Sequence, residues 1–198
     1  MKIVSWNLLH STGATLDQVA QLAERERPDL LLMQEATDQV DRLPEKIGGH
    51  YARNPLPGRI HGLAAWCPNP FPTTPHHIVL QPGIFVQRIS QIVMLDRFAI
   101  ANVHLSHGQL MNRRQLRRIA KHLPHSAMII GDCNMVGPGL LPGFQDVGER
   151  SPTHDMGRLV PLRLDRCFIR GLRCDRAEIL PPMGSDHRPI ALWVEPNG

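Results

Sequence analysis

Four polar clusters in this chain carry residue types that suit hydrolysis of a phosphate ester. They are Ser5-Trp6-Asn7, Met33-Gln34-Glu35, Gly131-Asp132-Cys133-Asn134 and Ser185-Asp186-His187-Arg188-Pro189. Each places a carboxylate, carboxamide or imidazole beside an apolar run that predicts a buried strand. Attack of water on a phosphodiester needs neutralised charge, a positioned nucleophile and protonation of the leaving oxygen. Because the clusters are spread over the whole sequence and share a place at strand ends, we expect them to form one site.

The apolar pattern also predicts the elements that would bring these clusters together. Strands are expected at residues 2–8, 29–35, 62–67, 84–95, 99–105, 127–131, 162–169, 177–180 and 189–194. Helices are expected at residues 16–27, 37–47 and 109–123, with Pro28 and Gly48-Gly49 as stop signals for the first two. The chain has 198 residues and shows no repeat or linker, so we expect one domain over residues 1–198.

Composition limits the class of protein and its compartment. Four cysteines are scattered without a C-x-x-C pair, which indicates free thiols in a reducing compartment rather than a zinc ribbon. No apolar region of a signal peptide follows Met1, and no apolar run approaches the ~18 residues that span a bilayer. We therefore expect a cytoplasmic protein with no membrane-spanning segment, monomeric and without an obligate protein partner.

The charges are unevenly distributed along the sequence. Lys and Arg total 22 against 18 Asp and Glu, and the pI is about 9.2. Between Lys46 and Gly131 the single acidic residue is Asp96, against ten basic residues, whereas the rest of the chain has 12 basic and 17 acidic residues. This asymmetry predicts a polyanionic partner, with nucleic acid as the expected substrate. The alternative is a solvated helix face, since Arg113 and Arg117 are spaced by four.

Six motifs occur in an order that resembles a known superfamily. They are Asn7, Gln34-Glu35, Asn102-Val103-His104-Leu105, Gly131-Asp132-Cys133-Asn134, Leu164-Asp165-Arg166 and Ser185-Asp186-His187. Together they resemble the endonuclease/exonuclease/phosphatase superfamily, the fold of pancreatic deoxyribonuclease and the apurinic-site endonucleases, from Ile3 to Val194. The resemblance implies an α/β (α+β) fold: a four-layer sandwich of two mixed β-sheets with helices outside and the site at one rim.

The resemblance also implies roles for individual residues. Glu35 would be the principal ligand of Mg²⁺ or Mn²⁺, with Asn7 and Asp186 helping to hold the metal. This is consistent with the preference of hard cations for oxygen ligands. Asp132 would orient or deprotonate the attacking water, and Asn134 would bind phosphate.

Two histidines complete the implied site. Asp165 would accept from His187, fixing its tautomer and favouring its cationic form. His104 would be a general acid or a phosphate ligand. Pancreatic deoxyribonuclease pairs that histidine with a glutamate from an intervening strand, whereas this chain has no acidic residue between Glu45 and Asp96. We therefore expect that particular pairing to be absent.

These features predict a Mg²⁺-dependent phosphodiesterase, namely a nuclease that acts on DNA or RNA. Arg113, Arg114 and Arg117 on the expected helix would contact the backbone of the nucleic acid. One alternative is a phosphatase or phospholipase acting on inositol phosphates or phospholipid headgroups. Another is an inactive module that binds polyanions, but such relatives usually lose Glu35, Asp132 or His187, all of which are present here.

Overall fold

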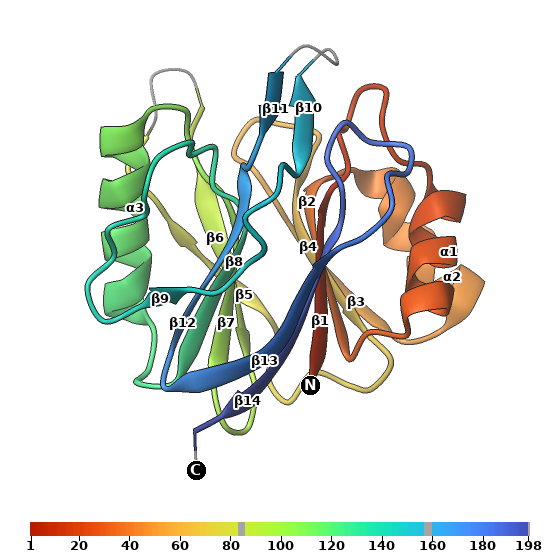
Figure 1. Cartoon of the computed structure of the whole chain (residues 1–198). Coiled ribbons are helices and arrows are strands. Elements are labelled where there is room, and N and C mark those ends of the chain that lie inside the picture. The colour runs from red at the N-terminus through yellow and green to blue at the C-terminus, as the bar shows by residue number, and fades with distance from the viewer. Residues whose placement is uncertain (83–85, 157–159, 198) are drawn as a thin grey trace.

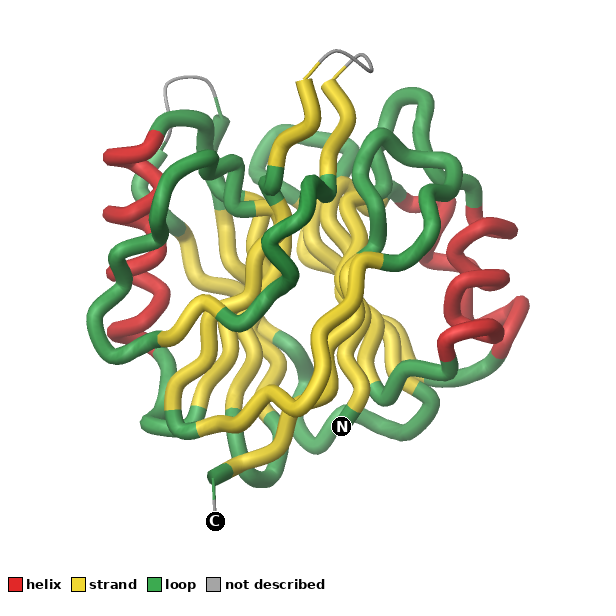
Figure 2. Tube along the Cα trace, in the orientation of Figure 1, coloured by secondary structure: helices red, strands yellow, loops and turns green. Residues whose placement is uncertain are grey.

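Two six-stranded sheets lie face to face, with helices on both outer sides (Figures 1 and 2). The structure is a computed structural model that describes residues 1–82, 86–156 and 160–197. Both sheets are mixed, because β1 runs parallel to β2 and β7 parallel to β8 while the other pairs are antiparallel. This is the four-layer α/β sandwich that the sequence predicted.

The first sheet brings both ends of the chain together. Its order is β13 (Leu172–Ile179), β14 (Ile190–Pro196), β1 (Lys2–Asn7), β2 (Leu30–Ala36), β4 (Gly62–Cys67) and β3 (His50–Pro55). Its outer face is covered by α1 (Leu16–Glu26), the 3₁₀ helix η1 (Asp38–Arg42) and α2 (Leu43–Ile47). Helix α1 begins at a capping box, in which Thr15 and Gln18 exchange side-chain and backbone hydrogen bonds.

The second sheet is built from the middle of the chain. Its order is β5 (His76–Val79), β6 (Ile89–Met94), β7 (Ala99–His104), β8 (Ala127–Asp132), β12 (Asp165–Arg170) and β9 (Gln145–Asp146). Helix α3 (Gln109–His122) packs on its outer face. A separate ribbon, β10 (His154–Met156) with β11 (Val160–Leu162), rises at one end of the sandwich (Figure 1).

Successive side chains of a strand point to opposite faces of its sheet, so each sheet has one apolar layer on its inner face and another under its helices. Ile3 packs between the sheets, whereas its neighbour Val4 packs under the helices of the first sheet. In the same way Met128 of β8 lies between the sheets and Ile129 lies under α3. Both faces of the central strands are therefore buried, which explains why their sequences are continuous apolar runs.

Several expected elements differ in extent. The segment predicted as one helix over residues 37–47 divides into η1 and α2. The strand predicted from residue 84 begins at Ile89; residue 84 itself lies outside the described residues. Strands β3 and β5 were not predicted, because most of their residues are exposed or half-buried and they lack an apolar pattern. All four cysteines are free, as expected.

Across residues 1–82, 86–156 and 160–197, no helix is both long and apolar enough to cross a membrane.

Candidate active site

The predicted polar residues meet at one end of the two sheets. Asn7 ends β1, Glu35 lies at the end of β2, His104 ends β7, and Asp132 ends β8. Strand β12 runs antiparallel to β8 and begins there, so Asp165 lies opposite Asp132. The side chains of Asn7, Glu35, His104, Asp132, Asn134, Asp186 and His187 line a cavity of about 460 Å³. Asp165 does not line the cavity, but its carboxylate contacts the imidazole of His187.

An irregularity in β2 turns Glu35 into the cavity. The register of β2 against β4 shifts between Gln34 and Ala36, and Glu35 has a φ of 57°. Non-glycine residues rarely adopt this left-handed conformation, and bulges of this kind commonly redirect a side chain beside an active site. Oε2 of Glu35 accepts from the backbone N–H of His10 at 3.0 Å and also contacts its imidazole. Burial favours a higher pKa for Glu35, but its contacts with His10 hold the pKa below the usual value.

Asp132 is held by hydrogen bonds from both sheets. Its Oδ1 accepts from the backbone N–H of Asn134 at 2.9 Å, and its Oδ2 accepts from Nδ2 of Asn7 at 3.0 Å. The preceding Gly131 has a φ of 135°, and a Cβ there would lie 2.3 Å from the carbonyl oxygen of Val103. Position 131 therefore requires glycine, and this close approach of β8 to β7 fixes the carboxylate.

The amides of Asn7 and Asn134 are also engaged with the backbone. Oδ1 of Asn7 accepts from the N–H of Leu9 at 3.2 Å, and Nδ2 of Asn134 donates to the carbonyl of Leu105 at 2.9 Å. Both amides are thus fixed in orientation before any ligand binds.

His187 and Asp165 form a buried pair. Nδ1 of His187 lies 2.8 Å from Oδ2 of Asp165, and its Nε2 lies 3.8 Å from Oδ2 of Asp132. Burial alone would lower the pKa of His187, but the carboxylates of Asp165, Asp132 and Asp186 raise it to about 10. Burial raises the pKa of Asp132, against the effect of the His187 cation. The cavity therefore holds an imidazolium beside a buried carboxylate.

His104 faces two carboxylates, which belong to β2 and β8. Neither comes from the segment between Glu45 and Asp96, where pancreatic deoxyribonuclease would have its glutamate. Its Nε2 lies 3.3 Å from Oδ2 of Asp132, and its Nδ1 lies 3.8 Å from Oε1 of Glu35. Burial, followed by the charges of Arg88 and His187, lowers the pKa of His104 well below its ordinary value. A neutral imidazole suits hydrogen bonding to a phosphoryl group better than proton donation to a leaving oxygen.

Asp186 lies beside a histidine that the sequence did not single out. Its Oδ2 is 3.2 Å from Nε2 of His154, whose ring centroid lies 4.5 Å from that of His187. Potential ligand atoms of these three residues lie within 4.8 Å of one another. The approach of β10 to the segment before β14 creates this cluster through an isolated bridge between His154 and His187.

The donor atoms fit a hydrated divalent cation. Glu35 and Asp186 are carboxylates that line the same cavity, and within the described residues no hydrogen bond is made to Oε1 of Glu35. Mg²⁺ and Mn²⁺ are hard cations that favour oxygen ligands, and Mg²⁺ keeps several of its waters. Two carboxylates with an amide oxygen from Asn7 would satisfy such an ion.

Sequence reasoning missed several cavity residues. Arg88, His107 and His154 line the cavity, and the rings of His10 and His61 stack at 3.9 Å beside Glu35. Arg88 is 7% exposed, and its Nε has no hydrogen-bond partner among the described residues. The available signal was the content of 11 histidines in 198 residues, but their spacing in the sequence follows no period that could have placed them.

The three predicted arginines lie on α3, outside the cavity. Nη2 of Arg113 donates to the carbonyl of Pro138 at 3.1 Å, while Arg114 and Arg117 are exposed. The first turn of α3 is joined to the site, because Nδ2 of Asn112 donates to the carbonyl of Asn134 at 2.8 Å. The helix therefore starts beside the cavity and leads away from it.

Comparison with known proteins agrees with this fold. The Endonuclease/Exonuclease/phosphatase family model matches residues 4–187. A structure of a Bacteroides vulgatus endonuclease/exonuclease/phosphatase is 16% identical, with a TM-score of 0.83 and coverage of 99% of this chain and 98% of that chain. A conserved protein of unknown function from Enterococcus faecalis is 20% identical, with a TM-score of 0.77 and full coverage of both chains.

A truncated TDP2 from Caenorhabditis elegans is 19% identical, with a TM-score of 0.73 and coverage of 98% and 96%. A search of curated proteins found no match. The chain belongs to the endonuclease/exonuclease/phosphatase family. Membership of this family supports a phosphoric ester hydrolase.

Proposed function

We propose that this protein is a divalent-metal-dependent phosphodiester hydrolase that acts on nucleic acid by attack of water on phosphorus. The observation that carries the proposal is the geometry around Asp132. This buried carboxylate is held by Asn7 and by the backbone of Asn134, and it faces the paired His187. A fixed carboxylate can orient water and accept its proton, while an adjacent imidazolium neutralises phosphoryl oxygens.

The remaining cavity residues divide the other tasks. His187, backed by Asp165, and Arg88 supply positive charge where a phosphodiester would lie. Neutral His104 would hydrogen-bond to a phosphoryl oxygen, and Asn134 would position the same group. Glu35, Asp186 and Asn7 would hold the metal ion. When bound, that ion would polarise the phosphoryl group and stabilise the charge that develops on its oxygens.

Exposed charge on α3, which starts beside the cavity, favours nucleic acid over a compact headgroup. Some basic residues of the acid-poor segment are neutralised, since Arg53 pairs with Asp41 and Lys46 with Asp17. Arg114 and Arg117 remain exposed on α3, without an ion pair in the described part of the chain. A backbone with repeated phosphates can use such dispersed charges, whereas a single phosphate cannot reach them.

A substrate screen tests the proposed function directly. Hydrolysis of DNA, RNA, abasic DNA and inositol phosphates would be measured with Mg²⁺, with Mn²⁺ and with a chelator. We expect metal-dependent cleavage of a nucleic acid. Turnover of inositol phosphates alone would instead establish a phosphatase, and activity that persists in the chelator would contradict metal dependence.

Replacing Glu35 tests the metal site. Glu35→Gln keeps the shape of the side chain but removes its charge, so it should weaken binding of Mn²⁺ in calorimetry and reduce kcat about 10³-fold. Glu24→Gln, an exposed position on α1, is the matched control. Circular dichroism should be the same for both variants. Near wild-type turnover of Glu35→Gln at saturating metal would refute the assignment.

A further inference from the structure

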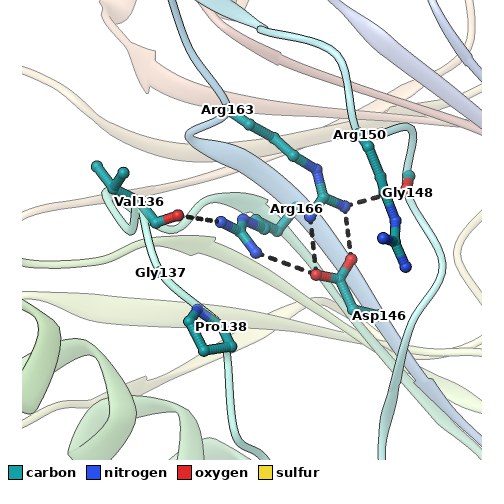
Figure 3. A pocket seen from close by; sticks show the side chains of 8 residues that line it. All are labelled: Val136, Gly137, Pro138, Asp146, Gly148, Arg150, Arg163 and Arg166. Carbon is teal, nitrogen blue, oxygen red and sulfur yellow. Dashed lines mark hydrogen bonds and ion pairs between the residues drawn. The ribbon is translucent and has the colours of Figure 1, made fainter.

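A second pocket, rich in arginine, adjoins the candidate active site. It has a volume of about 450 Å³ and is lined by Val136, Gly137, Pro138, Asp146, Gly148, Arg150, Arg163 and Arg166 (Figure 3). Val136 lines both this pocket and the catalytic cavity. Leu162 and Leu164 line the cavity, while Arg163 between them lines the second pocket. The two hollows therefore share a rim and lie on either side of one short segment.

Two of the arginines are fixed before any ligand binds. Arg163 makes two hydrogen bonds to the carboxylate of Asp146, at 2.9 and 2.6 Å. Arg166 donates to Asp146 at 3.1 Å and to the carbonyls of Met135 and Val136 at 2.9 and 3.1 Å. Arg166 is 4% exposed, so its charge is buried at the base of the pocket. Fixed cations bind an anion at a lower entropic cost than mobile ones.

Positive charge in the pocket exceeds the available negative charge. Three arginines line it, and Asp146 is the only acidic residue in its described lining. Arg150 is exposed and makes none of the contacts drawn in Figure 3. A purely structural cluster that fastens β9 to β12 would explain Arg163 and Arg166. It would not explain Arg150, which makes no ion pair with the described side chains and adds a further positive charge to the pocket.

We propose that this arginine pocket binds a backbone phosphate of the polynucleotide, next along the chain from the phosphate that is cleaved. This inference rests on the proposed function of the cavity. A strand whose scissile phosphate lies by His187 would pass over Val136, which is 65% exposed, and enter the pocket. Guanidinium groups match phosphate geometry, and Arg150, which has no hydrogen-bond partner within the described part of the chain, can donate to the oxygens of the phosphate.

The test measures how binding depends on the length of the substrate. Labelled single-stranded DNA, from a dinucleotide to a dodecamer, would be titrated with protein in a chelator, using fluorescence anisotropy. The dinucleotide has one backbone phosphodiester and cannot fill both sites. For wild type, the Kd should fall with length. Arg150→Glu should reduce the ratio of the dinucleotide Kd to the dodecamer Kd about tenfold, and Arg150→Lys should restore part of it.

Arg97→Glu provides the matched control, because Arg97 is exposed in the β6–β7 turn, at the opposite end of β7 from His104. The inference is overturned if Arg150→Glu keeps the wild-type ratio. An equal fall in affinity at every length also keeps this ratio, and would indicate a site for one isolated phosphate. Hydrolysis is assayed separately with metal, so absent cleavage would refute the proposed function while leaving the binding result readable.

Discussion

Asp132 is the residue on which the polar contacts of the cavity converge. Asn7 and Asn134 fix its two oxygens, and His104 and His187 approach the same oxygen at 3.3 and 3.8 Å. Burying the carboxylate of Asp132 with these polar groups costs stability unless a cationic ligand or a substrate binds to them. At this scale the unexpected residue is Arg88, a buried cation in the same cavity.

Arg88→Gln should therefore reduce kcat/KM about 10²-fold, since the variant has one charged donor fewer for the phosphoryl oxygens. Arg88→Lys should recover part of this activity because the charge returns, whereas a purely structural role would not be rescued by charge. Steady-state kinetics of both variants, with Arg97→Gln as the control, measure the effect. If Arg88→Gln has wild-type kcat/KM, Arg88 does not contact the reacting phosphate.

At the scale of elements, the ends of strands determine the site, and this was readable from the sequence. The apolar run Met128-Ile129-Ile130 placed Asp132 correctly at the end of β8, and the 2.8 Å contact of Asp165 with His187 is present as expected. The approach of His10 to Glu35 could not be predicted. It depends on a bulge in β2, and no sequence period encodes where a bulge occurs.

The exposed arginines of helix α3 are expected to contact the backbone of the nucleic acid. Arg113 supports the loop at Pro138, so its removal would confuse binding with folding. The double variant Arg114→Ala/Arg117→Ala should weaken binding to all DNA sequences about equally. It should also flatten the log–log salt slope by about 0.7 for each single-strand phosphate that is no longer neutralised. A charge-matched pair on the edge strand β13, Arg173→Ala/Arg176→Ala, is the control. Equal slopes for both pairs would show that the face of α3 is only solvated surface.

At the scale of the whole molecule, a polar bridge fixes one sheet against the other. Asn102 of β7 is fully buried, and its Nδ2 donates to the carbonyls of Met33 and Ala64 at 3.1 and 3.0 Å. Its Oδ1 accepts from Nε2 of Gln34 at 2.7 Å. The Asn-x-His-Leu motif thus joins the sheets at Asn102, two residues before His104. The distance between residues of β7 and β2 in the cavity depends on this bridge.

Asn102→Leu keeps a similar volume but leaves buried polar partners of the bridge unpaired, among them Oε1 of Gln91. It should lower the free energy of unfolding by about 2–4 kcal/mol, measured with urea. Ile100→Val, in the same strand and the same core, should cost about 0.5–1.5 kcal/mol. Because the sheets carry opposite halves of the site, kcat of folded Asn102→Leu should also fall, while Ile100→Val should retain it. Equal decreases in stability and unchanged kcat would mean that apolar packing alone sets the spacing of the sheets.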